Sequence, residues 1–325
     1  MPDTTRARTA PSTPGRLVQW LPERVDGRVR VFAWLSFLAE VLIIATGGAV
    51  RLTGSGLGCP TWPLCTPESL IPTPEMAIHG VIEFGNRTLT GLVGILAVIV
   101  LVLVWRMRHA RRDLFMLALV VVVGVGAQAI VGGVTVLTGL NPFIVGFHYV
   151  SSVVLVCVTA AFLARMDAQP GPRVRSVPRG YAILTHITSL VLAVTVAFGV
   201  LTTGAGPHSG DEAAGRNGFD AQVLEHVHAW PGYVLFALTL VLTIAAWIGR
   251  LPVRRWITAL LVIEIVQVLV GLYQARNGLP ELAVGVHMVL AALTAATMTV
   301  VVLRLRRPAA EDPAASTPTA STAHA

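Results

Sequence analysis

Hydrophobic residues along this chain fall into eight long runs separated by short polar connections. The runs lie near residues 31–50, 88–106, 114–138, 142–165, 181–202, 221–248, 256–275 and 281–303. A helix needs about 20 apolar residues to cross the hydrocarbon core of a bilayer. Each run must be helical in lipid, where no water satisfies unpaired backbone groups. The pattern therefore predicts an all-α polytopic membrane protein with eight transmembrane helices.

The composition agrees with a membrane protein. The chain has 325 residues, of which 54% are hydrophobic and 13% charged, and its mean hydropathy is +0.72. These values lie far from those of a soluble domain. Most of the cations behind the net charge of +7 stand in the connections between runs. We therefore interpret the charge as a topology signal and expect no nucleic-acid partner.

The basic connections alternate along the chain, which predicts its orientation. Arginines crowd the connections after the second, fourth, sixth and eighth runs, whereas the other connections carry few. Because basic loops stay in the cytoplasm, we expect a multi-pass protein of the cell membrane with both termini cytoplasmic. Residues 1–30 then form a cytoplasmic arm, 166–180 a cytoplasmic linker, and 304–325 a disordered cytoplasmic tail rich in Ala, Pro, Ser and Thr.

The two halves of the chain repeat each other. Matching positions include Glu83 with Glu225, Asn86 with His228, Gln128 with Gln267, and His148 with His287. Each half has an even number of crossings, so both halves insert in the same orientation. We predict two pseudo-symmetric four-helix bundles, a parallel tandem repeat formed by residues 31–165 and 181–303.

Two histidines of the second half are candidate ligands for a flat cofactor. His228 and His287 lie near the outer ends of the sixth and eighth runs. Two neutral imidazoles on opposite faces of a macrocycle suit heme iron; the alternative is two unrelated histidines bonded to helix carbonyls. His226 is two positions from His228, roughly 200° around a helix, so only one of them can bind the iron. The repeat favours His228.

The first half is asymmetric. His148 is the counterpart of His287, but Asn86 stands where a second histidine is expected, and an amide binds heme iron poorly. A site with one good ligand and one open position can do chemistry, so we expect the substrate in this half. His79 shares a helical face with Glu83 and Asn86. It is either a substitute ligand or a proton-sharing partner of Glu83.

Glu83 and Arg87 stand one helical turn apart, just before the second run. Ionisable groups at membrane depth are expensive and indicate function. A functional Glu83 would accept a proton beside the oxidised carbon, and Arg87 would hold a heme propionate. The alternative is an ion pair at i and i+4 whose members only neutralise each other.

Cys59 and Cys65 flank Pro-Thr-Trp-Pro-Leu in the first outer connection. An oxidising outer face allows a short disulfide between them, which would shape a lid over the first-half site. Two reduced thiols are the alternative. A zinc site would need two further ligands that this connection lacks.

Taken together, these motifs resemble those of the heme A synthase family. The resemblance rests on the stretch from Arg51 to Cys65, which joins Thr-Gly-Ser-Gly to Cys-x5-Cys, on Ile82–Leu89, and on the histidines in Gly-Phe-His148, Glu-His-Val-His228 and Gly-Val-His287. It covers residues 31–303. It implies a membrane oxidoreductase that oxidises a methyl group of heme O to a formyl group by successive hydroxylations, giving heme A for terminal oxidase.

The same resemblance implies roles for single residues. It assigns a heme b cofactor to His228 and His287, and the substrate heme to a site near Glu83 and His148. Family members often carry a second first-half histidine where this chain has Asn86.

The implied partners are heme O and heme A, a heme O synthase, the terminal oxidase assembly, and quinone or another electron acceptor. A competing hypothesis is a bis-His b-type membrane cytochrome for quinone-linked electron transfer. That cytochrome would hold two bis-His sites, which Asn86 argues against. A transporter built from a parallel repeat is less well supported, because the discontinuous helices typical of one are not evident.

Overall fold

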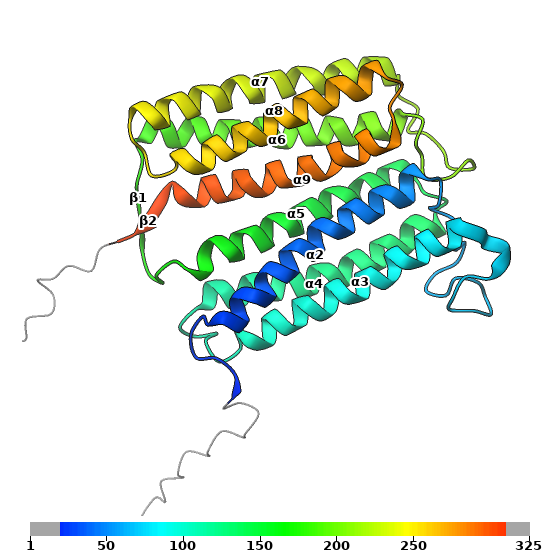
Figure 1. Cartoon of the computed structure of the whole chain (residues 1–325), viewed down its shortest axis with the longest axis horizontal. Helices are drawn as coiled ribbons and strands as arrows, with labels where there is room; N and C mark the ends of the chain where they lie inside the picture. Colours follow the sequence, from blue (N-terminus) through cyan, green and yellow to red (C-terminus); the bar gives the residue numbers. More distant parts are fainter. Residues whose placement is uncertain (1–19, 310–325) are drawn as a thin grey trace, which may run out of the picture.

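The computed structural model describes residues 20–309, so parts of the expected amino-terminal arm and carboxy-terminal tail lie outside the described residues. Eight helices are long and apolar enough to cross a membrane (Figure 1). They are α2 (Gly27–Leu52), α3 (Ala77–Leu103), α4 (Arg112–Leu137), α5 (Pro142–Met166), α6 (Arg179–Ala205), α7 (Ala221–Ile248), α8 (Arg254–Arg276) and α9 (Glu281–Arg304). The predicted number of eight membrane-crossing helices is confirmed, and these helices are those of a multi-pass membrane protein.

Local chemistry explains where several helices begin. The Asp26 side chain accepts a hydrogen bond from the backbone N–H of Val29 and so caps α2. Asp220 accepts from two backbone N–H groups at the start of α7. Asn141 caps α5 in the same way, with Pro142 at the first helical position. Short polar side chains at these positions satisfy N–H groups that have no partner within the helix.

The start of α3 differs from the sequence prediction. The apolar run begins near residue 88, whereas the helix begins at Ala77, directly after the short 3-10 helix η1 (Pro74–Met76). The turns between Ala77 and residue 88 contain polar residues, so the hydropathy pattern does not predict that they belong to the helix. These turns carry Glu83 and Arg87, whose opposite charges pair within the helix. The candidate site residues of the first half therefore stand on a regular helix.

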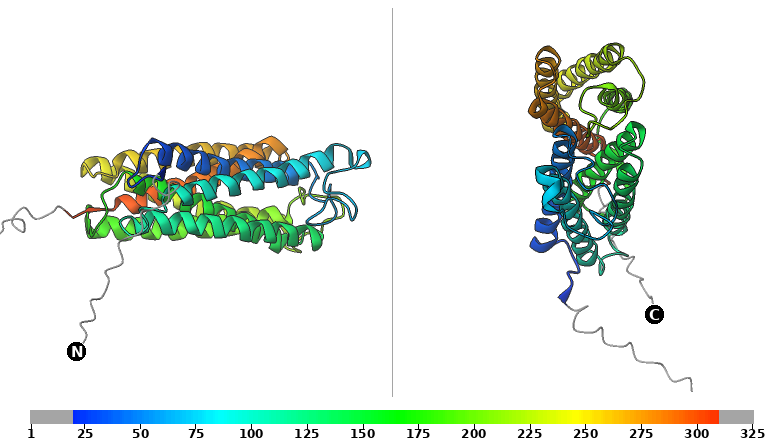
Figure 2. Two further views of the ribbon diagram at one scale, coloured as in Figure 1. Left: turned by 90° about the horizontal axis from the view of Figure 1, so that it is seen from below. Right: turned by 90° about the vertical axis from the view of Figure 1, so that its right-hand side faces the viewer.

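The helices run side by side along one long axis (Figures 1 and 2). Among α2 to α5, and again among α6 to α9, helices that follow each other in the chain pack together, and the first helix of each set also packs against the last. Helix α9 further contacts α5 and α2, and α5 contacts α6. At the α5–α9 contact the Tyr149 hydroxyl donates to the carbonyl of Met288, its counterpart in the repeat, over 2.8 Å. Division into two pseudo-symmetric bundles stays a prediction with which these contacts agree.

One end of the bundle carries residues 53–76 and is called here the loop end; α2 begins and α9 ends at the other, the terminal end (Figure 1). At the terminal end, β1 (Arg173–Arg175) pairs antiparallel with β2 (Arg306–Pro308). We expected residues 304–309 to belong to a disordered tail, and in this segment the prediction is wrong. Pairing with the linker orders the segment, and no local pattern marks a partner so far away in the chain.

Candidate functional site

His228 of α7 and His287 of α9 face each other in the second half. Their ring centroids are 6.2 Å apart and their planes are nearly perpendicular, at 82°. Metal–imidazole bonds are about 2 Å long and each nitrogen lies roughly 1 Å from its ring centroid, so two imidazoles on opposite sides of one metal have centroids about 6 Å apart. The spacing therefore fits a pair of axial ligands.

Neighbouring backbone groups hold these two rings. Nδ1 of His228 lies 3.0 Å from the carbonyl oxygen of Thr195, which leaves Nε2 for a metal. Gly199 and Gly271 make room for the rings, because a Cβ at either would lie 2.8 Å from Cε1 of His228 or 3.1 Å from Cε1 of His287. Nδ1 of His287 is buried without a hydrogen-bond partner among the described residues. A buried polar atom without a partner calls for an explanation, and a ligand bound at this site would be one.

Heme suits this pair better than a bare metal ion. Within residues 20–309, no three His, Cys, Asp or Glu side chains are grouped so that they could hold a metal ion. A bare ion needs about four or more protein ligands in a closed site. A porphyrin supplies its own equatorial nitrogens and requires only axial ligands.

The surroundings of His148 repeat those of His287. The Gln128 amide donates to the His148 carbonyl over 2.8 Å, as Gln267 does to His287 over 3.1 Å. A Cβ at Gly132 would lie 3.4 Å from Cε1 of His148. Nδ1 of His148 is also buried and unpartnered among the described residues. The repeat thus extends from the sequence to the contacts of the candidate ligands.

Asn86 takes a different arrangement from its counterpart His228. Its Oδ1 accepts a hydrogen bond from the Thr46 hydroxyl of α2 over 2.7 Å. His79 stands apart, because its Nδ1 lies 2.9 Å from the Ser55 hydroxyl and its side chain is exposed. His148 is half-buried, with a buried Nδ1, whereas His79 is bonded to the loop, and the role of His79 as a ligand stays a prediction.

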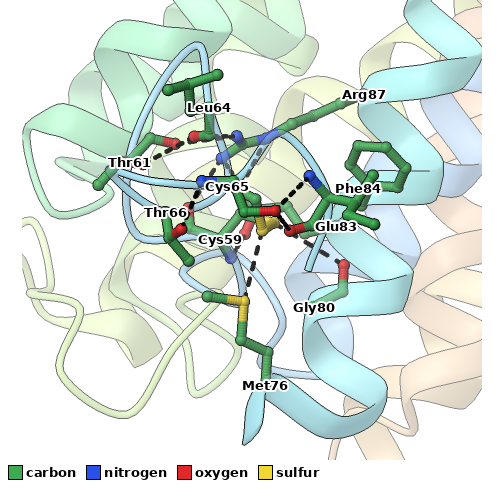
Figure 3. The surroundings of a disulfide bond; sticks show 12 residues. Cys59, Thr61, Leu64, Cys65, Thr66, Met76, Gly80, Glu83, Phe84 and Arg87 are labelled. Atoms are coloured by element: carbon green, nitrogen blue, oxygen red, sulfur yellow. Dashed lines mark hydrogen bonds and ion pairs between the residues drawn. A yellow bond between two sulfur atoms is a disulfide. The ribbon is translucent and has the colours of Figure 1, made fainter. Parts of the chain in front are cut away.

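The predicted disulfide between Cys59 and Cys65 is confirmed, and both cysteines are fully buried (Figure 3). The loop that it closes carries Trp62, and a side chain at Gly133 of α4 would overlap the Trp62 ring. The adjacent residue, Gly132, lies against His148. The loop therefore reaches the helix that borders the His148 ring, as a lid over this site would.

Glu83 and Arg87 attach this loop to α3 (Figure 3). Glu83 is 4% exposed; its Oε2 accepts from the backbone N–H of Cys59 over 2.6 Å, and its Oε1 accepts from Arg87. Arg87 also donates to the carbonyls of Cys59, Thr61 and Leu64. These contacts engage all five guanidinium N–H groups. A propionate could bind Arg87 only if some of these bonds opened.

The last turn of α2 and the loop that follows it contact the second half at the loop end. Arg51 donates to the carbonyls of Thr203 and His208, over 2.9 and 2.8 Å. The backbone N–H of Gly56 donates to the carbonyl of Gly210 over 2.7 Å. A Cβ at Gly56 would lie 2.7 Å from the end of the Leu140 side chain and 3.0 Å from the backbone oxygen of Gly210, so this part of the Thr-Gly-Ser-Gly motif favours glycine.

Two buried carboxyl groups were missed by the sequence reasoning. Glu40 of α2 is 2% exposed and Glu264 of α8 is 3% exposed. The Thr239 hydroxyl donates to Oε1 of Glu264 over 3.0 Å, but Oε2 of Glu264 and Oε1 of Glu40 have no hydrogen-bond partner among the described residues. The signal that could have found them is a single acid near the middle of an apolar run.

Comparison with known proteins identifies relatives of this chain. Residues 30–207 match the family model COX15-CtaA, described as cytochrome oxidase assembly protein. The chain is 32% identical over 181 residues to the heme A synthase of Halalkalibacterium halodurans, an alignment that covers 54% of this chain and 58% of that protein. It is 28% identical over 181 residues to the heme A synthase of Alkalihalophilus pseudofirmus (55% and 59% covered), and 33% identical over 174 residues to that of Shouchella clausii (50% and 56%).

These alignments cover less than the full length of either partner. The chain spans somewhat more than half the length of these relatives. The family match includes the disulfide, Glu83, Arg87 and His148, whereas His228 and His287 lie beyond residue 207. The interpretation of the second pair therefore rests on its geometry and on the internal repeat.

Proposed function

The chain belongs to the COX15-CtaA family of cytochrome oxidase assembly proteins, and on that premise we propose that it is a heme A synthase. In this role it is a membrane oxidoreductase that oxidises a methyl group of heme O to the formyl group of heme A, by successive hydroxylations. The observation that carries the proposal is the inequality of two otherwise similar sites. One site has facing imidazoles 6.2 Å apart, and the other has a single half-buried imidazole, that of His148, with an amide at the second ligand position.

Each half has its own proposed task. The second half, residues 181–303, holds heme b between His228 and His287, and the first half, residues 31–165, receives heme O at His148. When bound, heme b supplies one-electron transfer. Thr195 orients the His228 ring, and His287, whose Nδ1 is buried, faces it from α9.

The chemistry of the substrate places demands on the first half. With water as the source of the oxygen atom, oxidation of a methyl group to a formyl group releases four electrons and four protons, so the site needs an electron acceptor and a proton acceptor. Glu83 is the proposed proton acceptor. Its present partners, Arg87 and the backbone N–H of Cys59, stabilise the carboxylate. Proton uptake therefore requires one of these partners to move away, and the same opening would free Arg87 for a propionate.

The lid has a protective task in this proposal. The disulfide, Glu83 and Arg87 keep the loop on α3, and Trp62 reaches the backbone beside His148. Water exclusion strengthens electrostatic interactions at a reacting centre and prevents side reactions. His79 contributes to the closed state through Ser55, and becomes a ligand only if that contact is given up.

The proposal extends to the cell. The protein lies in the cell membrane with both termini in the cytoplasm, receives heme O from a heme O synthase, delivers heme A for terminal oxidase assembly, and passes electrons to quinone or another acceptor. The alternating basic connections and the eight apolar helices support this topology.

Identification of the bound pigments tests the function. The protein is purified from cells that co-express a heme O synthase, and its non-covalent hemes are extracted and identified by chromatography and mass. Heme B together with heme O or heme A supports the synthase. Heme B alone at two per chain would instead indicate the b-type cytochrome, and the absence of heme would refute both.

A further inference from the structure

Seven arginines converge on one open cavity of about 710 Å³ at the terminal end of the molecule. They come from the end of α5, from β1, from the α7–α8 connection, from the end of α9 and from β2. This arginine basin is lined by Arg165, Arg173, Arg175, Arg250, Arg304, Arg306 and Arg307. Figure 1 shows β1 and β2 at the end opposite the disulfide loop. Along α7, His228 and Arg250 are separated by about 30 Å at 1.5 Å per residue, so the basin is remote from the heme sites.

The positive charge of the basin is not balanced within the described part of the chain. No Asp or Glu of residues 20–309 lines it, and none of its seven arginines forms an ion pair with a described carboxylate. The nearby acids are already paired, Asp167 with Arg30 and Asp113 with Arg111. Burial, and next the Arg165 cation, lower the pKa of Arg173, although the Asp113 carboxylate nearby acts in the opposite direction. The basin therefore concentrates seven cations with no carboxylate among the described residues that line it, and Asp113 offsets only part of their charge.

Topology alone does not explain this convergence. The positive-inside rule requires cations on the cytoplasmic side, and arginines dispersed over that surface would satisfy it. Here the β1–β2 ladder places Arg175 directly opposite Arg306. Like charges at directly opposed positions of an antiparallel pair are destabilising. The arginines of the basin therefore repel one another in the folded chain. An anion bound among them would offset this repulsion, so the arrangement indicates an anion-binding site.

We propose that the arginine basin binds the phosphate headgroup of an anionic phospholipid, with a two-phosphate cardiolipin headgroup as its best ligand. Guanidinium groups bind phosphate oxygens in bidentate fashion. Basic pockets between helices on the cytoplasmic side of a membrane bind such headgroups, and the volume lies within the range of roughly 300–1,000 Å³ usual for small-molecule pockets.

The surface beside the basin suits the acyl chains of a lipid. Ile248, two residues before Arg250, is 80% exposed, and Trp247 is 52% exposed. Arg304 stacks on Trp256, with 5.5 Å between the guanidinium carbon and the ring centroid. Tryptophans at the headgroup level are typical of the membrane interface. Because Arg165 belongs to the first half and Arg250 and Arg304 to the second, a bound lipid would link the halves.

Lipid titration of the delipidated full-length protein tests this proposal. Native mass spectrometry measures binding of cardiolipin, phosphatidylcholine and inorganic phosphate to wild type and to Arg175→Gln/Arg306→Gln. The matched control is Arg112→Gln/Arg255→Gln, which removes two exposed arginines at the same end that do not line the basin. We expect wild type and control to bind cardiolipin alike, and the basin variant to bind it about tenfold or more weakly.

Several results would overturn the proposal. One is equal cardiolipin affinity in the basin variant and the control; another is equal binding of phosphatidylcholine by wild type. Inorganic phosphate that binds as tightly as cardiolipin would assign the basin to a free anion. Cardiolipin bound only by a chain shortened after Ala309 would assign it to the chain's own acids, Glu311 and Asp312. If Arg175→Gln/Arg306→Gln loses its heme, Arg250→Gln/Arg307→Gln replaces it in the same comparison.

Discussion

Replacement of Arg87 by leucine should release the disulfide loop from α3. The substitution removes the donors that Arg87 gives to Glu83 and to the carbonyls of Cys59, Thr61 and Leu64. It also leaves the Glu83 carboxylate, whose side chain is 6% exposed, with the backbone N–H of Cys59 as its remaining donor among the described residues.

The expected magnitude follows from burial. Loss of one partner of a buried ion pair costs about 3–5 kcal/mol. Arg87 is 19% exposed, so water replaces part of what is lost and the lower value applies. A cost of about 3 kcal/mol corresponds to roughly a hundredfold rise in the open population of the loop. Because the closed loop buries both cysteines, reduction of the disulfide requires this opening.

The assay measures the rate at which a small thiol reductant opens Cys59–Cys65, followed by alkylation and mass spectrometry of the freed cysteines. Arg87→Leu should be reduced about a hundredfold faster than wild type, and the control Arg112→Gln at the wild-type rate. A rate for Arg87→Leu within threefold of wild type would falsify the reasoning, because the loop would then be held by other contacts.

Glu83→Gln extends the same assay to the role of Glu83. The amide keeps one acceptor oxygen, so reduction should accelerate only about tenfold, as for the loss of one charged hydrogen bond at about 1.5 kcal/mol. A proton acceptor at Glu83 predicts that heme A formation stops in this variant, although its loop is better protected than in Arg87→Leu. If Glu83 only holds the loop, heme A formation should instead fall further in Arg87→Leu than in Glu83→Gln.

Three further outcomes are expected. His228→Ala and His287→Ala should each remove the low-spin heme b absorption spectrum. His226→Ala should keep the spectrum, because the His226 ring is exposed and its Nδ1 lies 2.8 Å from the carbonyl oxygen of Gln222 on the same helix. Loss of the spectrum in His226→Ala would assign the heme ligand to His226 in place of His228. Asn86→His should add a second low-spin bis-imidazole signal and slow heme A formation, because the new histidine would fill the proposed open ligand position. Electron paramagnetic resonance measures this signal. Unchanged spectra would show that Asn86 is not at the heme. Glu40→Leu should raise the free energy of unfolding in detergent by about 1–3 kcal/mol, because it removes a buried oxygen that has no hydrogen-bond partner among the described residues. A lower free energy of unfolding would indicate that Glu40 has a binding partner or a function.

Much of the architecture follows from the sequence because membrane folding has few solutions. An apolar run of sufficient length must be helical in lipid, so eight runs led to eight helices without knowledge of their packing. The Cys59–Cys65 disulfide was also predictable, since the two residues are close in sequence. The equivalence of His148 and His287 was visible as a repeat, and their glutamine and glycine neighbours repeat with them.

Contacts between distant segments were decided by the tertiary structure. The sequence left Glu83 and Arg87 with two readings, and the contacts of Arg87 with three loop carbonyls became visible only in the folded chain. Likewise the pairing of β1 with β2, and the arginine basin that it helps to build, join residues from the middle and the end of the chain. Periodicity reports which face of a helix is apolar, but not which backbone group or charge another segment brings against it. That information resides in packing, and packing placed the arginines together and set the disulfide loop against α4, beside the glycine that lies against His148.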